Sequence, residues 1–268
     1  MSSRNNSNYI NMRKHHNYIK YQLIKKSTSF LKRNFEKVNV LDISVGRFGD
    51  LHNYVRAGVD HVVGIDPNND SIQEAIKRNN NKGTNFELYT ACITDNTIPK
   101  VIEKRTFNIV CCHFTLHYFF KNEKMLQNAI KYVSNVLQSG GYFIVTTLDG
   151  NKITFTETPY YLIHKVNDTD QGTQSSYGKG TQSSYGKGTQ SSYGKGYYFK
   201  LNDGVDTGLY FNTVEQVEYV VNIEEFIGVC KKYSLKLISN KPFRAPNNLR
   251  PWEKDISELY TSLVFIKK

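Results

Sequence analysis

Apolar and polar positions along the chain follow two repeats, the alternation typical of a strand and the three-to-four-residue spacing typical of a helix. Short β-branched and apolar runs predict strands at residues 38–45, 60–66, 85–92, 107–114 and 142–148. Between them, the pattern predicts helices at 49–58, 68–80 and 122–141, after a basic helix from Arg13 to about Phe35. Strands that alternate with helices indicate a parallel sheet covered on both faces, with ligands at the carboxyl ends of the strands.

After residue 150 this alternation stops. The octapeptide TQSSYGKG occurs three times without variation, at 173–180, 181–188 and 189–196, and it has no apolar face with which to form a core. We therefore expect a flexible insert at 173–196, with contact to nucleic acid as the alternative role for its lysines and tyrosines. The Asn/Ser-rich residues 1–12 are predicted to be a flexible arm, and residues 13–268 a single domain. A helix at 222–233 and strands at 196–201, 208–221, 234–240 and 259–268 are predicted to complete the sheet and build a lid.

The first predicted strand runs directly into a glycine turn, VNVLDISVGRFGDL at 38–51. Ser44 stands where the dinucleotide pattern G-x-G-x-x-G has its first glycine, which argues against a plain NAD or FAD site. Asp42 lies within the apolar strand, and Asp66 ends the next strand, where an acid typically binds ribose hydroxyls. The pattern predicts a pocket for a nucleoside without a pyrophosphate, as in S-adenosylmethionine-dependent methyltransferases. The alternative for Asp42 is a structural acid that pairs with a core Arg or Lys.

Aromatic residues follow the fourth predicted strand in the stretch CCHFTLHYFF at 111–120. His117 and Tyr118 combine a flat face with a polar tip, which suits stacking on a purine or hydrogen bonding to it. Phe119 and Phe120 are expected in the core. The end of this strand is therefore a candidate base-binding site.

The net charge of +11 and the isoelectric point near 9.3 favour an acidic partner. Nucleic acid is favoured over a membrane because no long apolar run is present, and a basic protein without a polyanionic partner is the alternative. The four cysteines show no C-x-x-C spacing, which indicates a reducing compartment. We expect no metal ion.

Five stretches, in family order, make the chain resemble the messenger-RNA cap guanine-N7 methyltransferase family. They are HHNYIKYQLI at 15–24, VLDISVGRFGDL at 40–51, CHFTLHYFF at 112–120, GGYFIVTTLDGNKI at 140–153 and VEYVV at 217–221. The resemblance implies the Rossmann-like α/β fold of class I methyltransferases, a mostly parallel seven-stranded sheet with helices on both faces. It implies methyl transfer from S-adenosylmethionine to N7 of the guanine cap (GpppN) of mRNA, with S-adenosylhomocysteine as the product.

The resemblance also assigns residues to two sites. Lys20 would contact the methionine carboxylate of the cofactor, Asp42 its amino group and Asp66 the ribose. The full cofactor set is Lys20, Asp42, Gly46, Asp50, Asp66 and Asp95. The cap set is Phe114, His117, Tyr118, Glu218 and Tyr260, in which Glu218 would accept hydrogen bonds from the N1–H and amino group of guanine, with a solvent-facing strand acid as the alternative.

Guanine N7 is unprotonated at neutral pH, so we expect an in-line displacement without a general base, oriented by His117, Tyr118 and Glu218. The basic helix at 13–33 would steer the cap triphosphate and the RNA chain. The sequence departs from the family pattern at Phe48, which is expected to crowd the glycine turn. It also departs at Cys92, which falls near the usual adenine-contacting acid, with Asp95 as its substitute.

The set of motifs is similar to the versions found in large cytoplasmic DNA viruses, where the domain often follows triphosphatase and guanylyltransferase domains. Those domains and capped RNA are therefore the expected partners, and a cytoplasmic, viral location is expected. Two alternatives stay open. One is an inactive methyltransferase fold that serves as a binding or stimulatory subunit. The other is a methyltransferase that acts on another RNA or on a small molecule.

Overall fold

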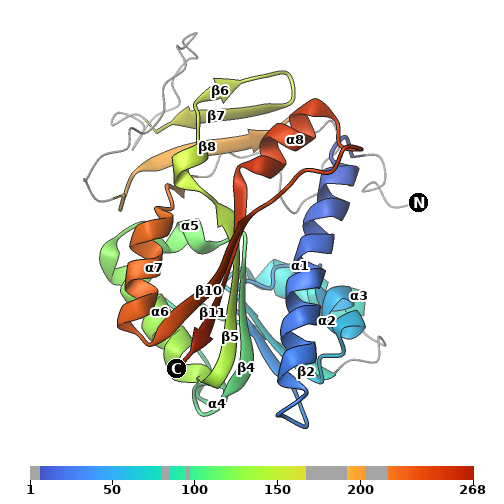
Figure 1. Cartoon of the computed structure of the whole chain (residues 1–268), viewed down its shortest axis with the longest axis vertical. Coiled ribbons are helices and arrows are strands. Elements are labelled where there is room, and N and C mark those ends of the chain that lie inside the picture. Colours follow the sequence, from blue (N-terminus) through green and yellow to red (C-terminus); the bar gives the residue numbers. More distant parts are fainter. Residues whose placement is uncertain (1–6, 80–84, 95–96, 167–191, 203–216) are drawn as a thin grey trace.

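A seven-stranded sheet forms the centre of the computed structural model, which describes residues 7–79, 85–94, 97–166, 192–202 and 217–268 (Figure 1). Its strands are β1 (Asn39–Asp42), β2 (His61–Asp66), β3 (Asn85–Thr90), β4 (Phe107–His113), β5 (Leu137–Leu148), β10 (Leu235–Pro242) and β11 (Tyr260–Lys267). Their order is β3-β2-β1-β4-β5-β11-β10. β11 runs antiparallel to β5 and β10, and the other neighbouring pairs are parallel. The predicted mostly parallel α/β sheet is confirmed.

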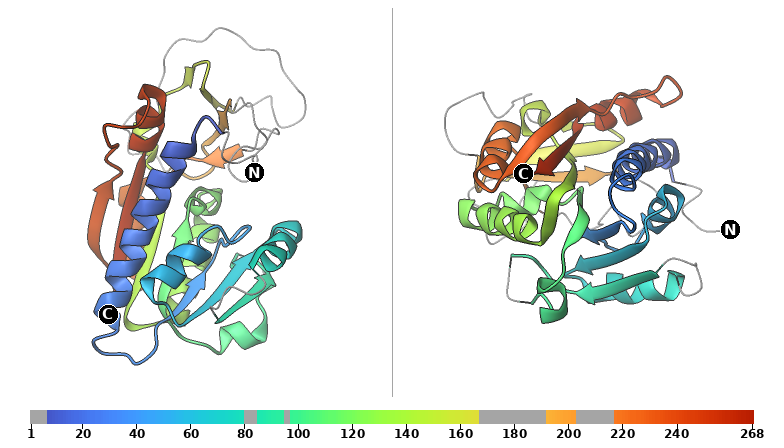
Figure 2. Two further views of the ribbon diagram at one scale, coloured as in Figure 1. Left: turned by 90° about the vertical axis from the view of Figure 1, so that its right-hand side faces the viewer. Right: turned by 60° about the horizontal axis from the view of Figure 1, so that its bottom comes forward.

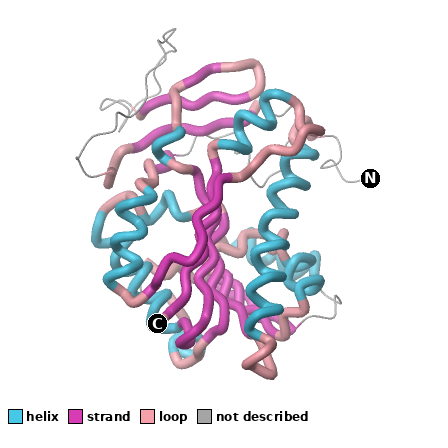
Figure 3. The backbone as a smooth tube through the Cα atoms, in the orientation of Figure 1, coloured by secondary structure: helices cyan, strands magenta, loops and turns pink. Residues whose placement is uncertain are grey.

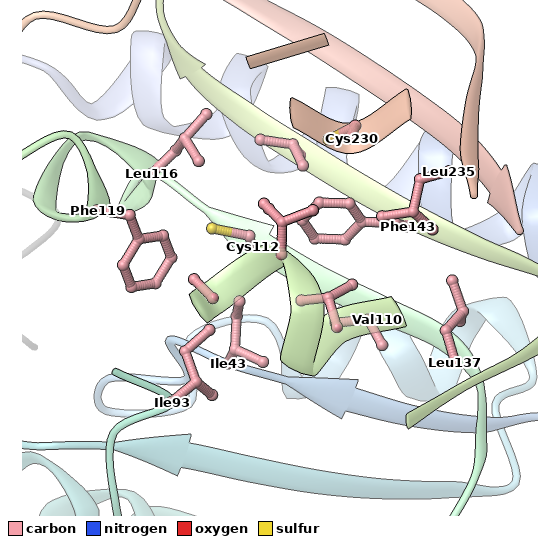
Figure 4. Close-up of a cluster of buried hydrophobic side chains, with 14 of the residues drawn as sticks. Ile43, Ile93, Val110, Cys112, Leu116, Phe119, Leu137, Phe143, Cys230 and Leu235 are labelled. Carbon is pink, nitrogen blue, oxygen red and sulfur yellow. The ribbon is translucent and has the colours of Figure 1, made fainter. Parts of the chain in front are cut away.

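Helices cover both faces of this sheet (Figures 1 and 2). One face carries α1 (Ile10–Leu31), α2 (Leu51–Ala57) and α3 (Asn69–Asn79), and the other carries α6 (Glu123–Val136) and α7 (Ile223–Lys232). Each layer encloses its own buried cluster. Cys112 lies in the cluster beneath α6 and α7, which Figure 4 shows, and Cys111 lies in the one beneath α1 and α2. The two adjacent cysteines therefore point to opposite faces of β4, as the strand pattern predicts.

A second, antiparallel sheet lies beyond the carboxyl ends of the central strands (Figure 3). It consists of β6 (Thr156–Glu157), β7 (Tyr161–Lys165), β8 (Gly196–Leu201) and β9 (Val217–Tyr219). The prediction for the second half of the chain is thus correct for 234–240 and 259–268, which join the central sheet. The strand predicted at 196–201 is also confirmed as β8, and it pairs with β7 and β9 in the second sheet. Of the strand predicted at 208–221, residues 208–216 lie outside the described residues, and 217–221 contains β9. The helix α8 (Pro251–Glu258) and the strand β7 were not predicted.

The predicted flexible arm at 1–12 is wrong for residues 7–12, and residues 1–6 lie outside the described residues. The helix α1 begins at Ile10, and Tyr9 and Met12 are buried. The Met12 N–H donates to Glu253 Oε1 at 3.0 Å, so α8 fixes the start of α1. Composition alone missed this because the partner residues come from the far end of the chain.

The predicted helix at 122–141 ends early, at Val136. Leu137 is extended and pairs with Phe107, so the residues before the glycine pair already belong to β5. At Gly141 an added Cβ would lie 2.8 Å from the carbonyl oxygen of Asn108. This glycine therefore allows close strand packing and is not the end of the helix.

The last residues of the third repeat, 192–196, are packed against the core, which corrects the prediction of a flexible insert there. The Ser192 hydroxyl donates to Glu225 Oε2 at 2.6 Å, and the Tyr193 ring stacks on Phe120 with centroids 5.6 Å apart. The Gly194 N–H donates to the Phe120 carbonyl at 3.0 Å. The first two copies lie outside the described residues.

Candidate functional site

Three neighbouring parallel strands end in polar side chains at the same edge of the central sheet. β1 ends at Asp42, β2 at Asp66 and β4 at His113. In open α/β sheets, ligands bind at the carboxyl ends of the strands because the loops and helix N-termini gather there. The fold thus brings together predicted cofactor residues that are distant in sequence.

Asp42 is buried and has two hydrogen-bond donors. The Tyr54 hydroxyl donates to its Oδ2 at 2.8 Å, and the Ser44 N–H donates to its Oδ1 at 3.1 Å. Burial, followed by the charge of Asp50, raises the pKa of Asp42 to about 7. Tyr54 takes the place of the core Arg or Lys that we considered as a partner. This tyrosine was not predicted, although it is a polar-tipped aromatic in the helix directly after the glycine turn.

Lys20 and Asp50 form an ion pair at 2.6 Å, and their side chains are only 4% and 13% exposed. The Asn53 amide also donates to Asp50 Oδ1 at 2.8 Å. Burial opposes ionisation of Asp50, but the charge of Lys20 and these hydrogen bonds outweigh it, and the pKa of Asp50 is lowered. The pair places an ammonium group beside a carboxylate. That arrangement is complementary to a zwitterionic amino acid.

Asp66 connects the end of β2 to the glycine turn. The Gly46 N–H donates to Asp66 Oδ2 at 3.0 Å, and the Asn68 N–H donates to Oδ1 at 2.9 Å. Gly46 has φ +51°, a left-handed conformation that glycine adopts without strain.

The predicted crowding of this turn by Phe48 is wrong. Phe48 is buried, and its ring packs in the core against Phe86 and Tyr54, with centroids 5.4 and 6.2 Å away. Its own φ of 55° is the conformational cost, since left-handed backbone is uncommon for a residue with a Cβ.

The adenine side of the predicted cofactor pocket is less complete. Asp95 lies outside the described residues. Cys92 engages the following loop, since its N–H donates to Thr97 Oγ1 at 2.8 Å. His113, which was not predicted, adds a polar atom to the pocket: its Nδ1 contacts Thr146 Oγ1 at 3.1 Å, and its buried Nε2 has no hydrogen-bond partner among the described residues.

A second group of predicted residues gathers between α5 (Leu116–Phe119) and β9. His117 Nδ1 lies 4.0 Å from Glu218 Oε2, and the rings of His117 and Tyr118 are 4.1 Å apart. Burial lowers the pKa of His117, and Glu218 opposes this only in part, so the ring is neutral at pH 7. The buried Nε2 of His117 has no hydrogen-bond partner within the described ranges.

Glu218 is fixed by Tyr197, a residue that was not predicted. Tyr197 and Glu218 are directly paired across β8 and β9, and the fully buried Tyr197 hydroxyl donates to Glu218 Oε2 at 2.7 Å. Burial and the neighbouring carboxylate raise the pKa of Tyr197 well above its usual value. Glu218 is therefore not a solvent-facing strand acid, since its side chain is 19% exposed.

Phe114 and Tyr260 belong to one aromatic wall, with ring centroids 5.2 Å apart. His16 of α1 stacks on Phe114, with ring centroids 5.7 Å apart, and Phe243 packs against His16 to complete the cluster. The Lys20 ammonium lies 5.3 Å above the Phe114 ring, so the wall adjoins the Lys20–Asp50 pair. The two predicted sites are thus neighbours.

Solved structures with the same architecture include proteins named as methyltransferases, some of them as S-adenosylmethionine-dependent. One from Clostridium acetobutylicum superimposes with a TM-score of 0.54 at 15% identity over 91% of both chains. The CcbJ methyltransferase from Streptomyces caelestis superimposes with a TM-score of 0.56 at 13% identity, over 91% of this chain and 89% of that one. The chain therefore has the fold of this class of methyltransferases.

Within that class, the chain belongs to the mRNA (guanine-N(7))-methyltransferase domain family, whose model matches residues 1–264. It is similar to the mRNA cap guanine-N(7) methyltransferase of Schizosaccharomyces pombe, with 29% identity over 87% of this chain and 62% of that protein. The Saccharomyces cerevisiae protein of the same name is 30% identical over 90% of this chain and 54% of that protein. A probable mRNA-capping enzyme of Acanthamoeba polyphaga mimivirus is 28% identical over 65% of this chain and 16% of that protein.

The chain therefore spans less than two thirds of the length of these relatives. The predicted family resemblance is confirmed. In the part of the chain that the structure describes, no helix has both the length and the apolar character needed to cross a bilayer.

Proposed function

We propose that this domain transfers a methyl group from S-adenosylmethionine to N7 of the guanine cap at the 5′ end of mRNA. Membership of the family supports this activity, as do the names of the two yeast relatives. The observation that carries the proposal is the set of buried polar groups around Glu218. Its carboxylate is held by Tyr197, and the buried Nε2 of His117 lies close by.

These groups match the edge of guanine in donors and acceptors. Guanine offers N1–H and amino donors beside the O6 acceptor, and no other base does so. The Glu218 carboxylate would accept from both donors, and neutral His117 would donate from Nε2 to O6. Tyr118 is 42% exposed and supplies a face for stacking, while Phe114 and Tyr260 form the wall behind it.

The cofactor pocket has groups of matching charge. When bound, S-adenosylmethionine supplies a methyl group on a positively charged sulfur. Lys20 would bind its carboxylate and Asp66 its ribose hydroxyls, beside the Gly46 turn. Asp42 is buried and holds the Ser44 N–H of the turn, whereas the Asp50 side chain is 13% exposed beside Lys20, so we propose that Asp50 receives the amino group and that Asp42 stabilises the turn. The unpartnered Nε2 of His113 fits a polar ligand in this pocket.

Catalysis then consists of orientation. The Lys20 ammonium above Phe114 joins the two sites, so their ligands would meet end to end. Residues that fix guanine supply most of the advantage by aligning N7, because aligned reactants avoid a large entropic cost. Guanine becomes cationic on methylation, and the carboxylate of Glu218 would stabilise that charge. No side chain has to move a proton at N7.

The wider setting of the domain is proposed from its relatives. The chain covers 16% of a mimiviral protein named as a probable mRNA-capping enzyme. We propose capped RNA as the substrate, triphosphatase and guanylyltransferase domains as partners, and a viral, cytoplasmic location. Co-purification of this chain with either capping activity would test the partners.

A labelled methyl-transfer assay on the dinucleotide GpppA tests the activity. Glu218→Gln should lower kcat/KM by about a hundredfold or more, because the glutamine amide would place a donor against the donors of guanine. Glu224→Gln, on the exposed start of α7, is the matched control. An inactive chain that still binds the cofactor in equilibrium dialysis would favour the stimulatory-subunit alternative, and equal activity on uncapped guanosine would favour another substrate.

A further inference from the structure

Helices α1 and α2 together carry only positive charge. Neither Ile10–Leu31 nor Leu51–Ala57 contains an Asp or a Glu. Four residues recur along one stripe of α1 at spacings of four, three and four: Lys14, Tyr18, Tyr21 and Lys25. At about 1.5 Å per residue the stripe is roughly 16 Å long. In the left view of Figure 2, α1 lies in front with α2 beside it.

Two cations of this surface share one aromatic ring. Arg56 of α2 has its Cζ 4.3 Å from the centroid of the Tyr21 ring, and Lys25 has its Nζ 5.7 Å from the same centroid. Neither forms an ion pair with a carboxylate within the described ranges. Other cations on this side do: Lys20 pairs with Asp50 and Lys32 with Asp60. Holding two like charges together without a counter-charge is unfavourable, so this spot favours an anion from outside the chain.

An unusual aromatic side chain lies next to these charges. Tyr18 is 59% exposed, whereas Tyr21, one turn further along the stripe, is buried. An exposed ring among free cations is the combination that binds single-stranded nucleic acid, since cations contact phosphates and the ring stacks on a base. The helix that carries the stripe also reaches the candidate site, because Lys20 of the same helix has its ammonium 5.3 Å from the centroid of the Phe114 ring.

We propose that this seam, formed by Lys14, Tyr18, Lys25 and Arg56, binds the single-stranded RNA chain that follows the cap. The proposal rests on the proposed function. Lys14, Lys25 and Arg56 would contact phosphates, and Tyr18 would stack on an unpaired base. The proposal narrows the predicted role of the basic helix at 13–33, since it gives the seam residues Lys14 and Lys25 the RNA chain and not the cap triphosphate. The seam would therefore contribute to recognition of long substrates and leave the methylation of a bare cap unchanged.

The test compares kinetics on GpppA with kinetics on a short capped single-stranded RNA. The triple variant Lys14→Gln, Lys25→Gln, Arg56→Gln should raise KM for the capped RNA and leave kcat and KM for GpppA unchanged. It should also reduce the salt dependence of RNA binding, with a log–log slope smaller by about 2 for three lost phosphate contacts. Tyr18→Ala should raise KM for the capped RNA by about tenfold.

The matched control removes three cations from the opposite face of the sheet: Lys124→Gln, Lys131→Gln, Lys231→Gln. If the control triple and the seam triple change KM for capped RNA equally, the seam proposal is wrong. Binding of uncapped RNA, followed by fluorescence anisotropy, separates the two proposals. Suppose that the wild-type protein is inactive on GpppA, and that the triple variant binds RNA more weakly than the wild type. This result would refute the proposed function and support the seam proposal. Tighter seam-dependent binding of an acidic peptide than of RNA would overturn the RNA assignment.

Discussion

Replacement of Tyr197 by phenylalanine tests whether a buried hydroxyl positions the carboxylate of Glu218, which we propose to bind guanine. The change removes one oxygen and keeps the ring, so the fully buried site loses a hydrogen bond of 2.7 Å to Glu218 Oε2 without gaining a large cavity. Hydrogen bonds to charged groups contribute about 1.5–3 kcal/mol. If that energy fixes Glu218 in its binding orientation, kcat/KM for the cap should fall roughly 10- to 150-fold.

The assay measures methyl transfer to GpppA at varied cap and cofactor concentrations. The loss should be in KM for the cap, and the affinity for S-adenosylmethionine should stay unchanged because the Tyr197 hydroxyl binds Glu218 and not the Lys20–Asp50 pair. Tyr198→Phe is the control, since the next residue of β8 has its side chain on the other face of the sheet. A Tyr197→Phe enzyme with an unchanged KM for GpppA would refute the positioning role. A fall in melting temperature with no change in KM would reduce Tyr197 to a structural residue.

Three further outcomes follow from the same contacts. Lys20→Met should lower the melting temperature and weaken cofactor binding, measured by isothermal titration calorimetry. The change leaves the largely buried Asp50 without its cation, which typically costs about 3–5 kcal/mol. Unchanged cofactor affinity would contradict the assignment of Lys20 to the cofactor. The pKa of Asp42 is raised by burial to about 7, so the folded state binds this proton more tightly than the unfolded state; its stabilising effect is complete below about pH 4 and is lost as the pH rises to 7. Melting temperatures between pH 5 and 8 should therefore fall more steeply in the wild type than in Asp42→Asn, and equal slopes would refute this. Deletion of 173–188 should leave the melting temperature unchanged, because loop length has only a small effect on stability. Tyr193→Ala should lower the melting temperature by several degrees, since Tyr193 of the third copy stacks on Phe120. A reversed order would show that the first two copies stabilise the fold.

The chemistry of the two sites depends on elements that the central sheet does not supply. Glu218 comes from the second sheet, and His117, the proposed base-binding residue beside it, comes from α5, directly after β4. The second sheet is fixed in turn by the last residues of the third repeat, where Ser192 binds Glu225 of α7. Length variation within the repeats is therefore compatible with the site only if this final anchor is kept.

The sequence by itself determined the local features of this protein. Period-two and helical spacings located the central strands and helices, because those patterns depend on which face of each segment is buried. The spacing of Asp42, Gly46 and Asp66 predicted that these residues gather at one edge of the sheet, because the ends of neighbouring parallel strands meet there. The family motifs further identified Glu218 and His117, which the structure then brings within 4.0 Å.

Only the tertiary structure decided which group each charged side chain meets. Asp42 binds Tyr54 and Asp50 binds Lys20, and the sequence allowed either acid to take the lysine. Tyr197 meets Glu218 across a strand pair whose register depends on the whole second sheet. Such long-range partners leave no periodic signal along the chain, since their spacing is set by how separate elements pack. The same reason explains why the burial of Tyr9 and the core position of Phe48 were missed.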